Sequence, residues 1–180
     1  MEVFSKIIID RIRNDGPISF RDFMEMALYY PDLGYYSIGK DRTGGKGDFY
    51  TSPVLSSLFG EMIGKQLEEM WQILGKKEFV IVEYGAGSGF LCHDILKYLK
   101  NNEQLFHGLR YCIIEKNPVM QKKILPKELQ EKISWYHSIS DIGDFTGCVL
   151  SNELLDNFPV HLVVMQEELK EIKIDTLKKN

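Results

Sequence analysis

The sequence is poor in several features that would each indicate a particular class of protein. Its three cysteines, Cys92, Cys112 and Cys148, lie far apart without the spacing of a metal site, so we expect buried thiols in a reducing compartment. The 22 lysines and arginines are outnumbered by 26 acids, which leaves a formal net charge of -4. Without a basic excess, no large surface for nucleic acid or anionic lipid is expected.

Long apolar runs are also absent. No stretch approaches the roughly 18 apolar residues that a transmembrane helix needs, so no membrane span is expected. The opening segment "MEVFSKIIIDRIRND" carries acids, unlike an acid-poor transit peptide or a signal peptide. We therefore expect a cytoplasmic protein, and a prokaryotic one.

What the chain does contain changes character near Gly75. Residues 1–75 show apolar spacing typical of three helices, with Ser19 expected to cap the second and Ser52-Pro53 to begin a third that runs to Gly75. Residues 76–180 alternate short apolar runs with helix-like segments. We predict two regions with these bounds. The expected buried face of the third helix comprises Leu58, Met62, Leu67, Met70, Trp71 and Leu74.

The second region is predicted to form a doubly wound, Rossmann-like α/β sheet. Nearly continuous apolar strands separated by helices indicate a parallel sheet that is covered on both faces. Sheets of this kind usually have about six strands, so this one is expected to be incomplete. The predicted strands are 79–84, 111–116, 133–138, 147–153 and 161–166, the predicted helices are 90–99 and 118–125, and 101–109 is predicted to be a loop.

A turn with three glycines follows the first of these strands, in "VEYGAGSGFL" (82–91). Glycines allow the backbone to turn tightly and to approach a ligand closely. The dinucleotide fingerprint Gly-x-Gly-x-x-Gly would place its third glycine at position 90, which is Phe90, whereas the third glycine here is Gly89. This spacing counts against an oxidoreductase that uses NAD or FAD, although it leaves that alternative open.

Two acids accompany the turn. Glu83 precedes the first glycine by two residues, and a carboxylate there favours S-adenosylmethionine, which carries an ammonium and a sulfonium, over a pyrophosphate. Glu115 ends the second strand, where an acid can accept hydrogen bonds from both hydroxyls of a ribose. The alternative for Glu115 is a surface acid at the end of a strand.

Polar residues also follow the fourth strand, in "SNELLDNFPVH" (151–161). If a guanidinium is the methyl acceptor, carboxylates are its natural partners because they bind it bidentately. Glu153 and Asp156 are three positions apart, so on one helical turn they would share a face, next to Asn152. The alternative is that Asp156 only favours the start of a helix.

Five segments in this order resemble the MidA-like S-adenosylmethionine-dependent methyltransferases. That family includes a mitochondrial complex I assembly factor that methylates an arginine on a quinone-side subunit. The segment with Asp-Phe-Tyr-Thr-Ser-Pro is more specific than the glycine turn. The segments are "DGPISFRDFMEMALYYPDLGYYS" (15–37), "GGKGDFYTSPVLSSLFGE" (44–61), "VEYGAGSGFLCHDIL" (82–96), "YCIIEKNP" (111–118) and "SNELLDNFPVH" (151–161).

The resemblance implies a protein arginine methyltransferase whose cofactor is S-adenosyl-L-methionine. Its implied partner is a protein substrate, a quinone-side subunit of a complex I-like NADH dehydrogenase. The glycine-rich segment of the first region is implied to cover the cofactor, and His161 is a candidate on the acceptor side. The implied cofactor-binding residues are Asp48, Phe49, Thr51, Glu83, Gly85, Ala86, Gly87, Gly89 and Glu115, and the implied catalytic residues are Asn152, Glu153 and Asp156.

The chain departs from that family in two ways. Asn157 stands where relatives have a small residue, and the relatives are considerably longer. The missing strands and substrate lobe favour a second hypothesis, in which the chain is a non-catalytic assembly or interaction module. An uncovered sheet edge would also favour self-association into a homo-oligomer.

Overall fold

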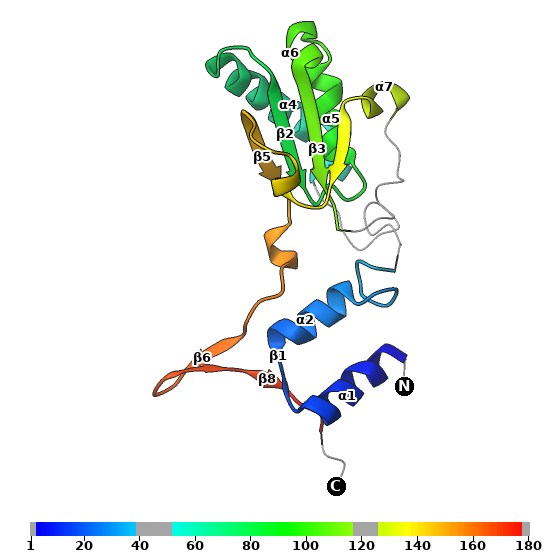
Figure 1. Ribbon diagram of the computed structural model, residues 1–180, viewed down its shortest axis with the longest axis vertical. Helices are drawn as coiled ribbons and strands as arrows, with labels where there is room; N and C mark the ends of the chain where they lie inside the picture. Colours follow the sequence, from blue (N-terminus) through cyan, green and yellow to red (C-terminus); the bar gives the residue numbers. More distant parts are fainter. Residues whose placement is uncertain (1–2, 39–51, 117–125, 178–180) are drawn as a thin grey trace. The chain divides into compact units, whose positions relative to one another are not determined.

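The computed structural model describes residues 3–38, 52–116 and 126–177. It divides into two compact units (Figure 1). The sheet unit comprises Asp41–Leu154, and the terminal unit comprises Met1–Lys40 together with Leu155–Asn180. The units therefore do not divide near Gly75, where the character of the sequence changes.

The sheet unit is built on four parallel strands in the order β4-β3-β2-β5 (Figure 1). The chain runs outward from β2 to β3 and β4, and then returns to the other side of β2 as β5. A reversal of this kind places a ligand site at the carboxyl ends of the central strands. The expected parallel, Rossmann-like sheet is confirmed. Its strands are β2 (Phe79–Tyr84), β3 (Leu109–Ile114), β4 (Ile133–Tyr136) and β5 (Gly147–Ser151).

The helices of the sheet unit correct two sequence predictions. The predicted third helix is two helices, because the Ser56 side chain accepts a hydrogen bond from the Leu58 amide and begins a new one. The predicted loop at 101–109 contains a short helix, because Asn102 accepts a hydrogen bond from the Leu105 amide at 3.1 Å and Leu105 is fully buried. The described helices are α3 (Ser52–Leu55), α4 (Ser57–Ile73), α5 (Phe90–Leu99), α6 (Glu103–Gly108) and α7 (Lys127–Gln130).

Alternate residues of the strands face two separate cores, as the period of a strand requires. Phe79, Ile81 and Tyr111 belong to a core with Leu96 of α5 and Trp71 of α4. The opposite face of the same strands packs around a second, smaller core, which comprises Val80, Val82, Cys112, Ile114 and Ile142. Both faces of β2 and β3 are therefore buried, which explains their nearly continuous apolar sequences.

The buried face of α4 differs from the predicted one. Leu67 and Trp71 are buried as expected, but the other two buried positions of the helix are Gly60 and Gly64. A Cβ on Gly60 would lie 2.4 Å from the Cβ of Asp94 in α5, so α4 can approach α5 this closely only with glycine there. The predicted face was wrong at Leu58, Met62 and Leu74, which are exposed.

The terminal unit has a small core of its own around Ile12, Ile18 and Met26. Ser19 caps its second helix as predicted, because its hydroxyl accepts a hydrogen bond from the Asp22 amide at 3.0 Å. Two short antiparallel ladders, β1 with β8 and β6 with β7, complete the unit. Its elements are α1 (Val3–Asp15), β1 (Ile18–Ser19), α2 (Phe20–Tyr29), the 3₁₀ helix η3 (Leu155–Asn157), β6 (Val163–Met165), β7 (Leu169–Glu171) and β8 (Lys173–Ile174).

The predicted strand at 161–166 exists as β6, but it does not join the parallel sheet. It pairs antiparallel with β7 in a hairpin. Only residues 152–162 separate β5 from β6, whereas a parallel crossover needs about a dozen or more residues and usually a helix. The predicted helix at 118–125 lies outside the described residues. Within the described parts of the chain, no helix has the length and hydropathy to cross a membrane.

Candidate functional site

The glycine turn connects β2 to α5 at the carboxyl end of the central strand. Gly85, Gly87 and Gly89 all have positive φ, at 69°, 53° and 78°, a region that side chains disfavour. A Cβ on Gly85 would lie 2.7 Å from the side chain of Leu154, whereas a Cβ on Gly87 or Gly89 would have no described atom within 4 Å. The turn therefore leaves open space beside its last two glycines.

Glu115 contacts this turn from the neighbouring strand. It follows β3 directly, and its Oε2 accepts a hydrogen bond from the Gly87 amide at 3.2 Å. The Gly85 amide donates to the carbonyl oxygen of Ile114 at 2.9 Å. These two bonds fix the turn to the end of β3, so that the carboxylate of Glu115 lies at the turn.

Glu83 lies at the next-to-last position of β2 and is 2% exposed. The Tyr111 hydroxyl donates a hydrogen bond to its Oε2 at 2.8 Å. Burial raises the pKa of Glu83 to about 7, the hydrogen bond from Tyr111 opposes that rise, and the charge of Glu115 adds to it. Sequence reasoning did not identify Tyr111, because no local pattern links two residues that meet across neighbouring strands.

The carboxyl ends of β2 and β3 therefore bring together most of the predicted cofactor-binding residues. Ala86, within the turn, packs against the larger core of the sheet unit. Asp48, Phe49 and Thr51, the other three predicted positions, lie outside the described residues. The residues gathered at the turn are Glu83, Gly85, Ala86, Gly87, Gly89 and Glu115.

The loop after β5 also reaches the glycine turn, through the contact of Leu154 with Gly85. The predicted catalytic residues Asn152 and Glu153 lie in this loop, Asn152 half-buried and Glu153 exposed. Glu153 adopts a positive φ of 49°, which is uncommon for a residue with a side chain. Nothing in its sequence neighbourhood predicted this conformation.

Asp156 lies in η3, which belongs to the terminal unit. Because η3 begins at Leu155, Glu153 and Asp156 do not share the helical turn that their spacing suggested. Burial raises the pKa of Tyr36, and the charge of Asp156 adds to the effect. The next residue, Asn157, accepts hydrogen bonds from two tyrosines, with its backbone oxygen from Tyr29 at 2.9 Å and with its side-chain oxygen from Tyr36.

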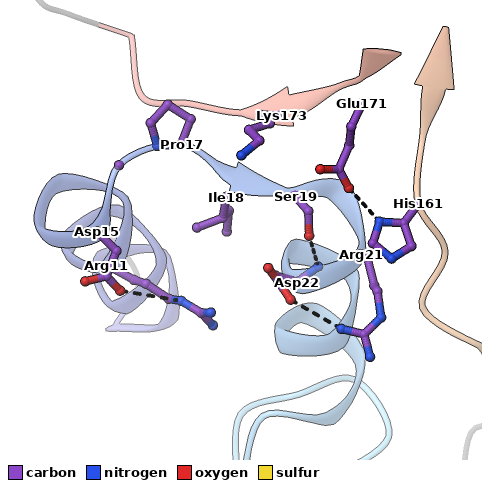
Figure 2. Close-up of a pocket in the computed structure, with 11 residues that line it drawn as sticks. Arg11, Asp15, Pro17, Ile18, Ser19, Arg21, Asp22, His161, Glu171 and Lys173 are labelled. Carbon is purple, nitrogen blue, oxygen red and sulfur yellow. Dashed lines mark hydrogen bonds and ion pairs between the residues drawn. The ribbon is translucent and has the colours of Figure 1, made fainter. Parts of the chain in front are cut away.

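The terminal unit carries a surface pocket of about 410 Å³, which Figure 2 shows in close-up. His161 lines it, and its Nδ1 lies 2.5 Å from Oε1 of Glu171. The two other carboxylates of the pocket also have basic partners, Asp15 with Arg11 at 3.9 Å and Asp22 with Arg21 at 3.5 Å. Asp15 and Asp22 therefore each pair with an arginine, Glu171 lies beside His161, and we assign no chemistry to the pocket.

The fold and the glycine turn together define a class of protein. In this sheet the order of the strands reverses beside β2, a glycine turn follows β2, and an acid follows β3. A parallel sheet with these features is typical of proteins that bind cofactors carrying a ribose. The buried Glu83 beside the turn fits a cationic cofactor better than a pyrophosphate. The open space at Gly87 and Gly89 is a cradle that side chains would fill, so these residues fit S-adenosylmethionine.

Comparison with known proteins identifies the family. Residues 62–179 match the model of a family described as "Putative S-adenosyl-L-methionine-dependent methyltransferase". The chain belongs to this family, whose cofactor is S-adenosyl-L-methionine. The resemblance stated from the sequence is therefore confirmed.

Individual relatives agree with this result. The chain is 31% identical to the mitochondrial protein arginine methyltransferase NDUFAF7 homolog of Drosophila melanogaster, over 92% of this chain and 43% of that protein. It is 32% identical to mitochondrial protein arginine methyltransferase NDUFAF7 of Homo sapiens, over 84% of this chain and 40% of that protein. The chain thus spans less than half the length of these two relatives.

A solved structure is similar as well. It belongs to a "likely methyl transferase" from Burkholderia thailandensis bound to S-adenosyl-homocysteine, with a TM-score of 0.83 and 26% identity. The similarity covers 97% of this chain and 47% of that one. The described fold therefore matches slightly less than half of that longer protein.

Proposed function

We propose that this chain binds S-adenosylmethionine at the glycine turn and takes part in methyl transfer to an arginine of a protein. The observation that carries the proposal is the open turn, fixed to the acid of the next strand by the bond from the Gly87 amide to Glu115. The relatives named as protein arginine methyltransferases support the choice of acceptor.

In this proposal, Glu115 binds the hydroxyls of the ribose. Room for the methionine moiety of the cofactor is left by the residues of the turn, Gly85, Ala86, Gly87 and Gly89. The buried carboxylate of Glu83 attracts the ammonium and the sulfonium of S-adenosylmethionine. Asp48, Phe49 and Thr51 are proposed to cover the cofactor, on the strength of the family resemblance alone. Bound S-adenosylmethionine supplies a methyl group on a sulfonium, from which the neutral thioether is a good leaving group.

The chain's own residues would then mainly hold and orient the acceptor. Glu153 lies in the loop that contacts the glycine turn, and its carboxylate is proposed to bind the guanidinium of the acceptor. Asn152, at the start of the same loop, is proposed to orient the acceptor by hydrogen bonding. Asp156 is proposed as an acceptor-side carboxylate on the strength of the family resemblance alone.

The proposed acceptor protein is a quinone-side subunit of a complex I-like NADH dehydrogenase, as the family resemblance implies. A cytoplasmic location is proposed as well. Self-association at the outer edge of β5 is the proposed oligomeric contact, because β5 ends the described sheet.

The ribose-binding role is tested with Glu115→Ala. The variant should bind S-adenosylmethionine at least about tenfold more weakly, because hydrogen bonds to a charged group contribute roughly 1.5–3 kcal/mol. Isothermal titration calorimetry measures this, with NADH as a second ligand. Glu131→Ala, at an exposed acid of the same unit, is the matched control and should bind like the wild type. An unchanged affinity in Glu115→Ala would refute the assignment, and binding of NADH alone would refute the methyltransferase proposal.

The acceptor role is tested with Glu153→Gln. This variant should keep its affinity for S-adenosylmethionine and lose about tenfold or more in methyl transfer, because an amide cannot pair with a guanidinium as a carboxylate does. Transfer of a radiolabelled methyl group into proteins of a cell extract provides the measurement. Loss of cofactor binding instead would place Glu153 in the cofactor site.

The second candidate function is a non-catalytic assembly or interaction module. The observation that favours it is the hairpin of β6 and β7, where Met165 is 70% exposed and Leu169 is 63% exposed. Such apolar side chains on an exposed hairpin are typical of a surface that binds another protein. Binding of S-adenosylmethionine by the wild type, with no methyl transfer to any extract protein, would favour this function.

A further inference from the structure

A pair of buried polar side chains lies beside the glycine turn, one on each of the two central strands. Ile81 of β2 is in register with Tyr111 of β3, and Glu83 is in register with Ile113. Tyr111 and Glu83 are therefore diagonal neighbours on the face that α5 covers, and a long side chain spans such a diagonal. The bond from the Tyr111 hydroxyl to Glu83 Oε2, at 2.8 Å, closes this diagonal.

The bond matters because both groups are out of water. Tyr111 is fully buried and Glu83 is 2% exposed, and a buried carboxylate is costly unless it accepts hydrogen bonds. Among the residues that the structure describes, Tyr111 is the one hydrogen-bond donor to Glu83. A carboxylate can accept about four hydrogen bonds, so Glu83 keeps acceptor capacity next to the turn.

We propose that Tyr111 is a positioning residue of the cofactor site, whose hydroxyl holds the Glu83 carboxylate ionised and oriented to attract the cationic methionine end of S-adenosylmethionine. The inference deepens the proposed function and rests on it. Tyr111 would not touch the cofactor. It acts through Glu83, and so it differs from the glycines and from Glu115, which line the turn.

The groups around Glu83 determine how this position responds to pH. Cys92 faces it from α5, its thiol pKa raised by burial and further by the charge of Glu83. Glu115, beyond the end of β3, is the nearby like charge that disfavours ionisation of Glu83. On the other side, β5 contributes the apolar Leu150, which is in register with Glu83. Tyr111 is thus the neighbour that favours the charged form.

The test is Tyr111→Phe, which removes the hydroxyl and keeps the buried ring. At pH 7 the variant should bind S-adenosylmethionine about tenfold more weakly than the wild type, because the loss of the hydrogen bond leaves Glu83 mostly protonated. The ratio of the two dissociation constants should shrink as the pH rises towards 9, where Glu83 ionises in both proteins. Taking the ratio at each pH cancels the cofactor's own titration.

Two controls separate this role from a structural one. Tyr136→Phe removes the hydroxyl of another tyrosine of the sheet, which contacts Arg110, and should leave the affinity unchanged at every pH. In a Glu83→Gln background, Tyr111→Phe should cause no pH-dependent loss. Carbon-13 NMR of labelled glutamate side chains reports the ionisation of Glu83 without the cofactor, and Tyr111→Phe should move that titration to higher pH.

The outcomes distinguish the inference from the function on which it rests. A wild type that binds S-adenosylmethionine, with a Tyr111→Phe variant of equal affinity and an unmoved Glu83 titration, would overturn the inference alone. A loss of affinity that is the same at every pH would also overturn it, since it would indicate only a packing defect. A wild type that does not bind the cofactor would overturn the proposed function, and the inference with it.

Discussion

Strand β2 of the parallel sheet and strand β6 of the hairpin have similar apolar sequences and very different surroundings. Ile81 and Val82 of β2 are completely buried, whereas Val163 is 48% exposed. β2 is hydrogen-bonded to a strand on each side and covered on both faces, whereas β6 has one described partner, β7. An apolar run therefore indicates a strand, but the connections and neighbouring layers decide whether that strand is buried.

The largest expected difference between the two regions is in stability. Leu96→Ala, in α5 over the sheet, should lower the free energy of unfolding by about 2–5 kcal/mol, because Leu96 is fully buried in the larger core. Leu169→Ala, in the hairpin strand β7, is the same change at an exposed position and should cost less than about 0.5 kcal/mol. Urea unfolding measures both. Equal losses would show that the hairpin is covered in solution.

A smaller difference concerns the ionisation of acids in the two regions. The pKa of Glu83 is about 7 in the folded protein, above its ordinary value of 4.5, so the folded state holds this proton more tightly than the unfolded state. Its contribution to stability is therefore complete below pH 4.5 and is lost as the pH rises to about 7. As the pH rises from 5 to 8, the free energy of unfolding of Glu83→Gln should therefore increase by roughly 2–3 kcal/mol relative to that of the wild type.

The measurement is chemical denaturation at a series of pH values. Glu168→Gln, an exposed acid of the hairpin region, serves as the control and should follow the wild type throughout this range. A Glu83→Gln variant that tracks the wild type at every pH would show that Glu83 keeps an ordinary pKa when folded.

The smallest expected effect compares two turns within the sheet unit. Gly87 and Gly143 both have positive φ and open space at the position of a Cβ. Replacing either by alanine should cost roughly 1 kcal/mol of stability, through backbone strain. Gly87→Ala should also weaken S-adenosylmethionine binding by about tenfold, since its methyl group enters the space of the cofactor. Calorimetry that finds the two variants equal in affinity would remove Gly87 from the cofactor site.

The sequence predicted the parallel sheet well because its strands carry a strong local signal. The bounds of β2 and α5 were as predicted, since Gly85 directly follows β2 and Gly89 directly precedes α5, which leaves little freedom in placing the ends beside the turn. The helix α6 was missed because six residues are too few to show a helical period, although Asn102 is a good cap. The pairing of β6 was wrong because the composition of a strand says nothing of its partner.

Contacts across the fold were the part that sequence reasoning could not reach. Gly60 and Gly64 carry no hydrophobic signal, and so the predicted buried face included the exposed Leu58 and Met62 in their place. The bond between Tyr111 and Glu83 joins residues 28 positions apart, and their proximity depends on the register of β2 and β3. The roles of Asn152, Glu153 and Asp156 remain predictions that the proposed experiments address.

The backbone of Glu153 has a consequence for how this protein could be changed. A residue with a side chain at φ 49° lowers the stability of the fold by about 1 kcal/mol relative to a glycine, because its Cβ strains the backbone in this conformation. Glu153→Gly is therefore a substitution expected to make the protein more resistant to heat. If the carboxylate serves the acceptor, the same substitution makes a poorer enzyme, and selection for thermal resistance alone would discard the residue that selection for turnover retains.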